Sequence, residues 1–81
     1  MIDQIREVLR QHAKLAVDVA TLKPESDLYE AGLTSHATVN LMVALEDQFG
    51  VEFPERMMRR RSFESIAAIE GALSQLTTAP A

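Results

Sequence analysis

The sequence contains no cysteine, which excludes a disulfide framework, a catalytic thiolate and thiolate ligation of a metal ion. It also lacks any apolar run near the ~20 residues that span a bilayer. Its first ten residues, MIDQIREVLR, are amphipathic and charged, whereas the core of a signal peptide is apolar. We therefore expect a cytoplasmic protein that has no membrane among its partners.

Groups that usually mark a metal centre or an active site are also scarce. The two histidines, His12 and His36, are isolated and do not form the ligand cluster that a metal site needs. The three glycines occur singly, which excludes a glycine-rich phosphate loop. His36 follows Ser35, but adjacent side chains of a helix diverge by about 100°, so the two are a poor pair of nucleophile and base. We predict no catalytic residue and no metal.

Aromatic residues make up only 5% of the chain although 47% of it is hydrophobic, so its core must consist mainly of Leu, Ile, Val, Met and Ala. Such side chains suit the packing of small helices. With 81 residues the chain is near the lower limit for one self-sufficient apolar core, and we predict a single domain over 1–81. Within it, residues 1–76 are expected to be folded and residues 77–81 to form a loose tail.

The net charge of −4 is unevenly distributed. Residues 55–61 hold four Arg and one Glu, a net +3, so the remaining residues carry −7. An acidic body disfavours nucleic acid as a partner. The arginine run has three interpretations, in decreasing order: a cluster that favours the dipole of a short helix, a docking patch for an acidic partner, and a nucleic-acid contact. The last lacks the interleaved aromatic residues that would support it.

The first predicted helix runs from about Ile2 to Ala16, because apolar residues recur there at intervals of three and four. Its stripe comprises Ile2, Ile5, Leu9, His12 and Ala16, widened by Val8 and Leu15. We interpret His12 as a boundary residue of this stripe and not as a ligand. Residues 17–33 are predicted to be mostly loop, because Lys23-Pro24 disfavours helix and the next residues are turn-like. Its expected anchors in the core are Leu22, Leu28, Tyr29 and Leu33.

The strongest helical pattern extends from about Ser35 to Phe49, and Gly50 is suited to end it in the left-handed conformation. The core side of this helix is predicted to hold Leu41, Met42, Leu45 and Phe49, with Thr38 among them. The opposite side holds His36, Asn40, Val43 and Asp47, flanked by Val39 and Glu46. Either Thr34 or Ser35 can cap the start of the helix, and local preference alone favours capping as the role of Ser35. If Thr34 is the cap, Ser35 becomes the first helical residue and its hydroxyl is exposed.

Beyond Gly50, an extended connector leads to Pro54, which suits the first position of a short helix over about Glu55–Arg60. Met57 or Met58 is expected to turn inward. Ser62 is predicted to cap a last helix with Glu64 in its first turn. The stripe of that helix comprises Phe63, Ile66, Ile69 or Glu70, Leu73 and Leu76. The predicted fold class is therefore all-α, a small bundle of three main helices and one short helix.

Residues 27–53 closely resemble the acyl carrier and peptidyl carrier family. The family signature is a Gly-hydrophobic-Asp-Ser-Leu turn, then T-V-x-L-x-x-x-L-E, then F-x-x-x-[IF]-P. The corresponding residues here are Gly32-Leu33-Thr34-Ser35-His36, Thr38-Val39-Asn40-Leu41, Leu45-Glu46, Phe49 and Phe53-Pro54. Thr34 replaces the usual Asp and His36 the usual Leu, which bears on the partner enzymes more than on the modification.

The resemblance implies the acyl-carrier fold and a 4′-phosphopantetheine arm on Ser35. A phosphopantetheinyl transferase would attach this arm from coenzyme A, and its thiol would hold an acyl or aminoacyl group as a thioester. The further partners would be an acyl- or amino acid:carrier protein ligase and a downstream accepting enzyme. The sequences Ala31–Ser35, Glu52–Pro54 and Arg61–Phe63 are more similar to aminoacyl carriers than to fatty-acid carriers.

A carrier of this kind is expected to be a monomeric phosphoprotein that docks through exposed side chains near Ser35. The candidate docking residues are His36, Val39, Asn40, Val43, Asp47, Arg59 and Arg60. An alternative from a different functional class is an unmodified helical adaptor that keeps the carrier fold without the arm.

Overall fold

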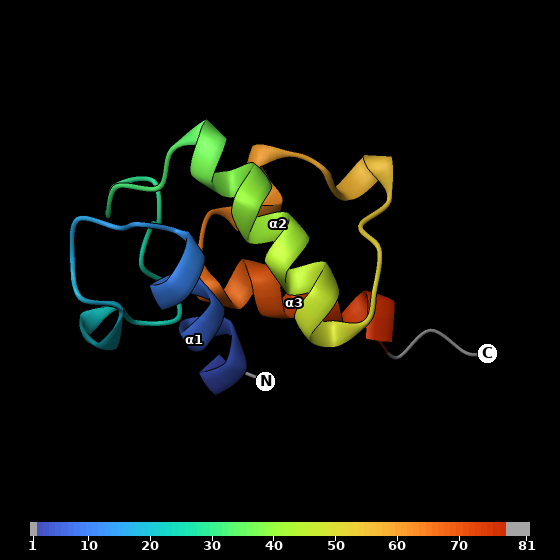
Figure 1. Cartoon of the computed structure of the whole chain (residues 1–81), viewed down its shortest axis with the longest axis horizontal. Coiled ribbons are helices and arrows are strands. Elements are labelled where there is room, and N and C mark those ends of the chain that lie inside the picture. The colour runs from blue at the N-terminus through green and yellow to red at the C-terminus, as the bar shows by residue number, and fades with distance from the viewer. Residues whose placement is uncertain (1, 78–81) are drawn as a thin grey trace.

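The computed structural model describes residues 2–77 and contains three α-helices, α1 (Ile2–His12), α2 (Ser35–Phe49) and α3 (Ile66–Thr77) (Figure 1). Three short 3-10 helices lie in the connections: η1 (Val19–Thr21), η2 (Glu55–Met57) and η3 (Arg60–Phe63). Residues 2–77 contain no strand, and no helix among them is long and apolar enough to cross a membrane. The predicted all-α class is confirmed.

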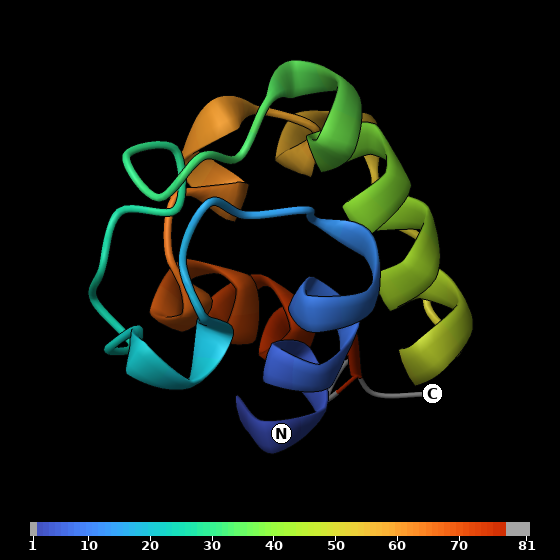
Figure 2. The ribbon, with the colours of Figure 1, turned by 60° about the vertical axis from the view of Figure 1, so that its left-hand side comes forward.

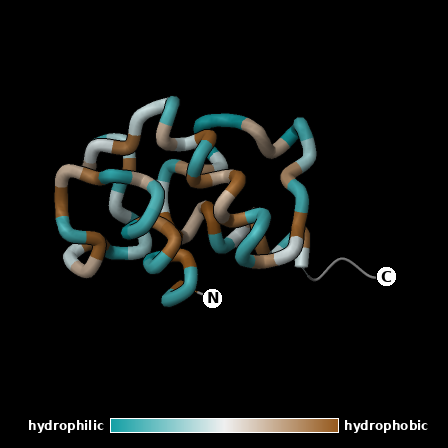
Figure 3. The backbone as a smooth tube through the Cα atoms, viewed as in Figure 1, coloured by the Kyte–Doolittle hydropathy of each residue, from teal (hydrophilic) through white to brown (hydrophobic). Residues whose placement is uncertain are grey.

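The apolar core lies between the three α-helices, with α1 packed against both α2 and α3 (Figure 2). Hydrophobic and hydrophilic segments alternate along each helix, as expected for helices that bury one face (Figure 3). The largest fully buried side chains are Ile5, Leu9, Leu28, Leu41, Leu45, Phe53, Ile66, Ile69 and Leu73. Phe53 and Phe63 also meet within this core, with ring centroids 5.4 Å apart. The core therefore has the aliphatic character that the composition predicts.

Helix α1 ends at His12, so the prediction that it continues to Ala16 is wrong. Lys14 adopts a left-handed conformation with φ +52°, which an α-helix cannot contain. His12 is exposed and does not lie on the apolar stripe; Ala13 is buried and follows Leu9 at the next core position. Ala16 is exposed, and its amide donates to the carbonyl of Ala31 at 2.9 Å. The chain thus leaves the helix to pair with the segment before α2.

The long connection between α1 and α2 is anchored to the rest of the molecule at several points. The Arg6 guanidinium donates to the carbonyls of Val19 at 3.0 Å and Leu22 at 2.8 Å, which ties η1 to α1. Near its other end, the Leu28 amide donates to the Glu64 carbonyl at 2.8 Å. The predicted anchors Leu22, Leu28 and Leu33 are buried, and Tyr29 is half-buried.

The connection after α2 differs from the predicted short helix. It begins at Glu55 as predicted but ends at Met57, before Arg60, and has 3-10 geometry. Pro54 is extended and precedes η2 instead of occupying its first position. Met57 is the methionine that turns inward, whereas Met58 is 51% exposed. A second 3-10 helix, η3, then carries Phe63 into the core.

Helix α3 begins later than the sequence analysis predicted. Ser62 belongs to η3, and Glu64 lies before the helix instead of in its first turn. The hydroxyl oxygen of Ser65 accepts a hydrogen bond from the Ala68 amide at 3.0 Å, so Ser65 has the capping role assigned to Ser62. Thr77 is the last residue of α3 and not part of a loose tail; residues 78–81 of that predicted tail lie outside the described residues.

Candidate functional site: the serine at the start of helix α2

Thr34 caps helix α2. Its backbone is extended, with φ −99° and ψ 165°, and its side-chain oxygen accepts from the Ala37 amide at 3.0 Å. The Thr34 carbonyl accepts from both the amide and the hydroxyl of Thr38, at 2.9 and 2.7 Å. Thr34, and not Ser35, is therefore the N-cap of α2.

Ser35 is the first residue of α2, and its side chain is exposed. Its hydroxyl forms no hydrogen bond with the described residues 2–77. The first amides of a helix have no intrahelical acceptor and lie at the positive end of the helix dipole. The first turn of α2 contains no acidic side chain. A negatively charged group on the Ser35 oxygen would therefore meet a favourable electrostatic field.

The segment before Ser35 is held by local hydrogen bonds. The Asp27 carboxylate accepts from the amides of Tyr29 at 2.8 Å and Glu30 at 3.3 Å, and the Leu33 amide donates to the Leu28 carbonyl at 2.9 Å. Gly32 has φ +113°, a conformation that side chains rarely tolerate. These contacts direct the chain into α2 with the Ser35 hydroxyl outward.

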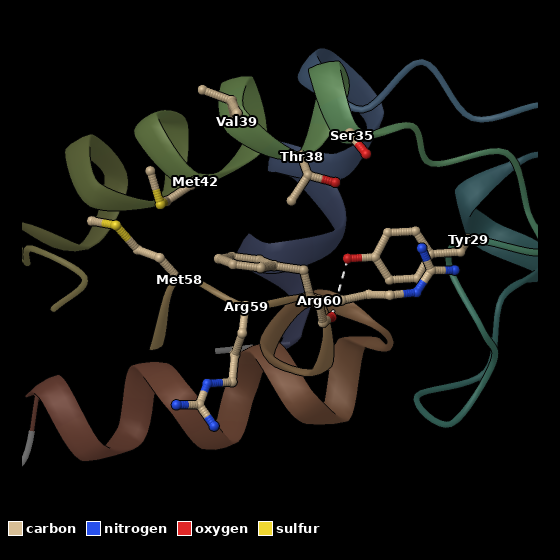
Figure 4. A pocket seen from close by; sticks show the side chains of 9 residues that line it. Tyr29, Ser35, Thr38, Val39, Met42, Met58, Arg59 and Arg60 are labelled. Atoms are coloured by element: carbon tan, nitrogen blue, oxygen red, sulfur yellow. Dashed lines mark hydrogen bonds between the residues drawn. The ribbon is translucent and has the colours of Figure 1, made fainter. Parts of the chain in front are cut away.

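A cavity of about 460 Å³ lies beside Ser35, between α2 and the segment that contains η2 and η3 (Figure 4). It is lined by Tyr29, Ser35, Thr38, Val39, Met42, Met58, Arg59, Arg60 and Phe63. Three separate segments of the chain contribute the lining residues that the sequence did not assign to this site, which are Tyr29, Thr38, Met42, Met58 and Phe63. The one signal in the sequence was the Met57-Met58 pair: because only one of the two methionines was expected to turn inward, the other was left to contact a surface site.

The predicted docking residues fall into two places. His36, Val39, Asn40, Val43 and Asp47 are all exposed on α2, and Val39 and Val43 are 57% and 48% exposed. Val39, Arg59 and Arg60 line the cavity beside Ser35. The residues Asn40, Val43 and Asp47 instead line a separate depression of about 360 Å³ against the end of α1, together with Gln11, His12, Lys14 and Ala44. The structure thus divides six of the seven predicted docking residues between two concave regions, and His36 lines neither of them.

Comparison with known proteins identifies the family. Residues 3–73 match the model of the family described as "Phosphopantetheine attachment site". The chain is 48% identical over 66 residues to the aminoacyl carrier protein of Agrobacterium fabrum, a match that covers 82% of this chain and 80% of that protein. The chain belongs to the aminoacyl carrier proteins. The predicted carrier family and its aminoacyl subgroup are confirmed.

Solved structures of aminoacyl carrier proteins have the same fold. The Agrobacterium tumefaciens carrier protein, in complex with an engineered Bradyrhizobium japonicum glycine:[carrier protein] ligase and AMP, matches with a TM-score of 0.89 and 44% identity, covering 91% of this chain and 99% of that one. A glycylated carrier protein bound to the Bradyrhizobium japonicum ligase matches with a TM-score of 0.67 and 31% identity, covering 88% and 90% of the two chains. In these two complexes, the carrier protein bound to the ligase therefore has the fold of this chain.

Proposed function

We propose that Ser35 carries a covalent 4′-phosphopantetheine arm, and that the chain presents an amino acid on this arm to its partner enzymes. The observation that carries the proposal is the exposed Ser35 hydroxyl, free of hydrogen bonds to residues 2–77, at the first position of α2. Thr34 supports it by capping the helix in place of Ser35. The arm supplies a terminal thiol, which holds the aminoacyl group as a thioester.

The modification itself requires an external enzyme. The Ser35 oxygen attacks the phosphate of coenzyme A that bears the pantetheine. A new phosphoester bond to Ser35 forms, the pyrophosphate bond breaks, and adenosine 3′,5′-bisphosphate leaves. Because the Ser35 hydroxyl has no hydrogen bond to a base within residues 2–77, we propose that the phosphopantetheinyl transferase accepts its proton. The positive end of α2 then stabilises the phosphodiester. In this proposal the chain is a carrier and not an enzyme.

Intact-mass measurement tests the attachment site. The chain is incubated with coenzyme A and a broad-specificity phosphopantetheinyl transferase, and the expected result is a gain of one phosphopantetheine. Ser35→Ala should abolish the gain. The matched control is Ser65→Ala, which removes the serine before α3. This variant should still be modified, because the Ser65 oxygen already accepts a hydrogen bond from the Ala68 amide. Modification of folded Ser35→Ala would refute the assignment, and no modification of the wild type would favour the unmodified adaptor.

We further propose that an amino acid:carrier protein ligase charges the arm and that a separate enzyme accepts the aminoacyl group. Similarity to a carrier that is glycylated and bound to a glycine:[carrier protein] ligase supports this class of partner. Docking is assigned to the exposed side of α2, through His36, Val39, Asn40, Val43 and Asp47, with Arg59 and Arg60 across the cavity. Val39 lines the cavity beside Ser35, and Val43 lies farther along α2 at the second depression; both are exposed and provide apolar area that is available to a partner.

Charging assays test this docking surface. Val39→Ser and Val43→Ser should each lower kcat/KM for charging of the modified protein by up to about tenfold, since each replaces by a hydroxyl an apolar side chain that a docked partner would bury. Val17→Ser is the matched control, because Val17 is similarly exposed, at 44%, but lies in the loop after α1. An equal loss with Val17→Ser would refute the docking surface. Comparing amino acids with fatty acids as substrates tests the cargo, and charging by fatty acids alone would refute an aminoacyl load.

A further inference from the structure

Tyr29 holds both the backbone and the side chain of Arg60, although the two residues are 31 positions apart. The Tyr29 hydroxyl donates a hydrogen bond to the Arg60 carbonyl at 3.1 Å (Figure 4). The Arg60 guanidinium lies over the Tyr29 ring, with its central carbon 3.9 Å from the ring centroid. At this distance the ring attracts the cation. Arg60 is thus restrained more than an exposed arginine usually is.

The charge of Arg60 is not neutralised within the described part of the chain. The one ion pair in residues 2–77 joins Glu7 and Arg10, so no carboxylate there pairs with Arg60. Arg60 and Ser35 line the same cavity, and the first turn of α2 has no acidic residue. A guanidinium is suited to phosphate oxygens because its donors match their geometry. The wall opposite Ser35 therefore offers a fixed cation without a partner in residues 2–77.

Arg59 lines the same cavity but is oriented differently. In Figure 4 its guanidinium extends toward α3, whereas Tyr29 and the Arg60 guanidinium lie at the end of the cavity where Ser35 is. The Arg59 guanidinium has no hydrogen bond, ion pair or ring contact within residues 2–77, although the Arg59 carbonyl accepts from the Ser62 amide at 3.0 Å. Of the two arginines, Arg60 has the position and the support for a group attached to Ser35.

We propose that Arg60, held by Tyr29, is a positioning residue that binds the phosphodiester through which the arm is attached to Ser35. The inference rests on the proposed attachment at Ser35. The phosphodiester would lie between the first amides of α2 and the Arg60 guanidinium. Such a contact restrains the first bonds of the arm and leaves its thiol end free to reach a partner.

The test compares the unmodified and modified forms of the chain by urea unfolding at low salt. Arg60→Gln should lower the stabilisation that modification confers by about 1.5-fold to 5-fold in the unfolding equilibrium constant, the range of a partly exposed ion pair. The difference in this stabilisation between the wild type and Arg60→Gln should decrease at high salt. Arg59→Gln is the matched control, with the same change of charge in the same cavity, and should leave the stabilisation unchanged. Arg60→Lys should restore part of it.

A second readout does not depend on stability. In ¹H–¹⁵N spectra the side-chain Nε–H resonance of Arg60 should shift on modification, that of Arg59 should not, and Tyr29→Leu should reduce the Arg60 shift. Intact mass is recorded first, so that the two proposals fail separately. No mass gain refutes the attachment and this inference with it. A mass gain with equal stabilisation in wild type and Arg60→Gln, or an equal effect of Arg59→Gln, refutes the inference alone.

Discussion

Substitution of Gly32 by alanine should destabilise the chain more than alanine at either of its other glycines. Gly32 has φ +113°, and an added Cβ would lie 2.9 Å from the Ala16 nitrogen and 3.3 Å from the Ala16 Cβ. The Ala16 nitrogen cannot easily move away, because it donates to the Ala31 carbonyl at 2.9 Å. The added methyl group therefore meets fixed backbone as well as an unfavourable φ.

The expected size follows from these two effects. A strained backbone conformation costs about 1–3 kcal/mol, and the backbone contact adds to this, so we expect a loss of about 3 kcal/mol in the free energy of unfolding. That is a large part of the roughly 4–12 kcal/mol expected for 81 residues. Gly50→Ala should cost about 1–2 kcal/mol, since Gly50 has φ +63° but nothing lies within 4 Å of its added Cβ. Gly71→Ala should stabilise by about 0.5–1 kcal/mol, because Gly71 is inside α3 with open space around it.

Urea unfolding followed by far-ultraviolet circular dichroism measures all three variants. The midpoints should fall in the order Gly71→Ala, wild type, Gly50→Ala, Gly32→Ala, with similar slopes. A loss for Gly32→Ala no larger than that for Gly50→Ala would refute the reasoning, because the Ala16 backbone would then have to yield freely. A lower midpoint for Gly71→Ala would contradict the open space at that position.

Two further predictions concern helix α2. Thr34→Ala should lower the free energy of unfolding by about 1 kcal/mol through loss of the cap on the Ala37 amide. Thr34→Asp should retain the wild-type urea midpoint. Equal midpoints for Thr34→Ala and wild type would contradict the capping role of Thr34. Leu41→Ala should cost about 2–5 kcal/mol because Leu41 is 0% exposed, whereas Val43→Ala, at a side chain 48% exposed, should change stability by less than about 0.5 kcal/mol. Comparable losses in the two would show that the predicted sides of α2 are misassigned.

Local signals were sufficient to predict helix α2. Thr34 and Gly50 are good caps at its two ends, and the apolar spacing between them places Leu41 in the core. Its bounds and its exposed side were therefore predictable, and so was the position of Ser35 once Thr34 was taken as the cap.

Elsewhere, equivalent local signals competed and long-range contacts decided between them. Ser62 and Ser65 are both suitable caps, and Ser65 has this role because η3 carries Phe63 against Phe53 before α3 begins. The spacing of α1 continues beyond His12, yet the chain turns there, with Lys14 left-handed. Periodicity does not report such a turn, because it records only which faces are apolar.

By itself, the sequence determined the all-α class, helix α2 and the carrier family, since each depends on residues within a few turns of one another. The cavity beside Ser35 and the stacking of the Arg60 guanidinium over the Tyr29 ring were decided only by the tertiary structure. Tyr29 lies in the loop before α2 and Arg60 in η3, and no local preference relates two such segments. Their approach results from the packing of both segments against the shared core.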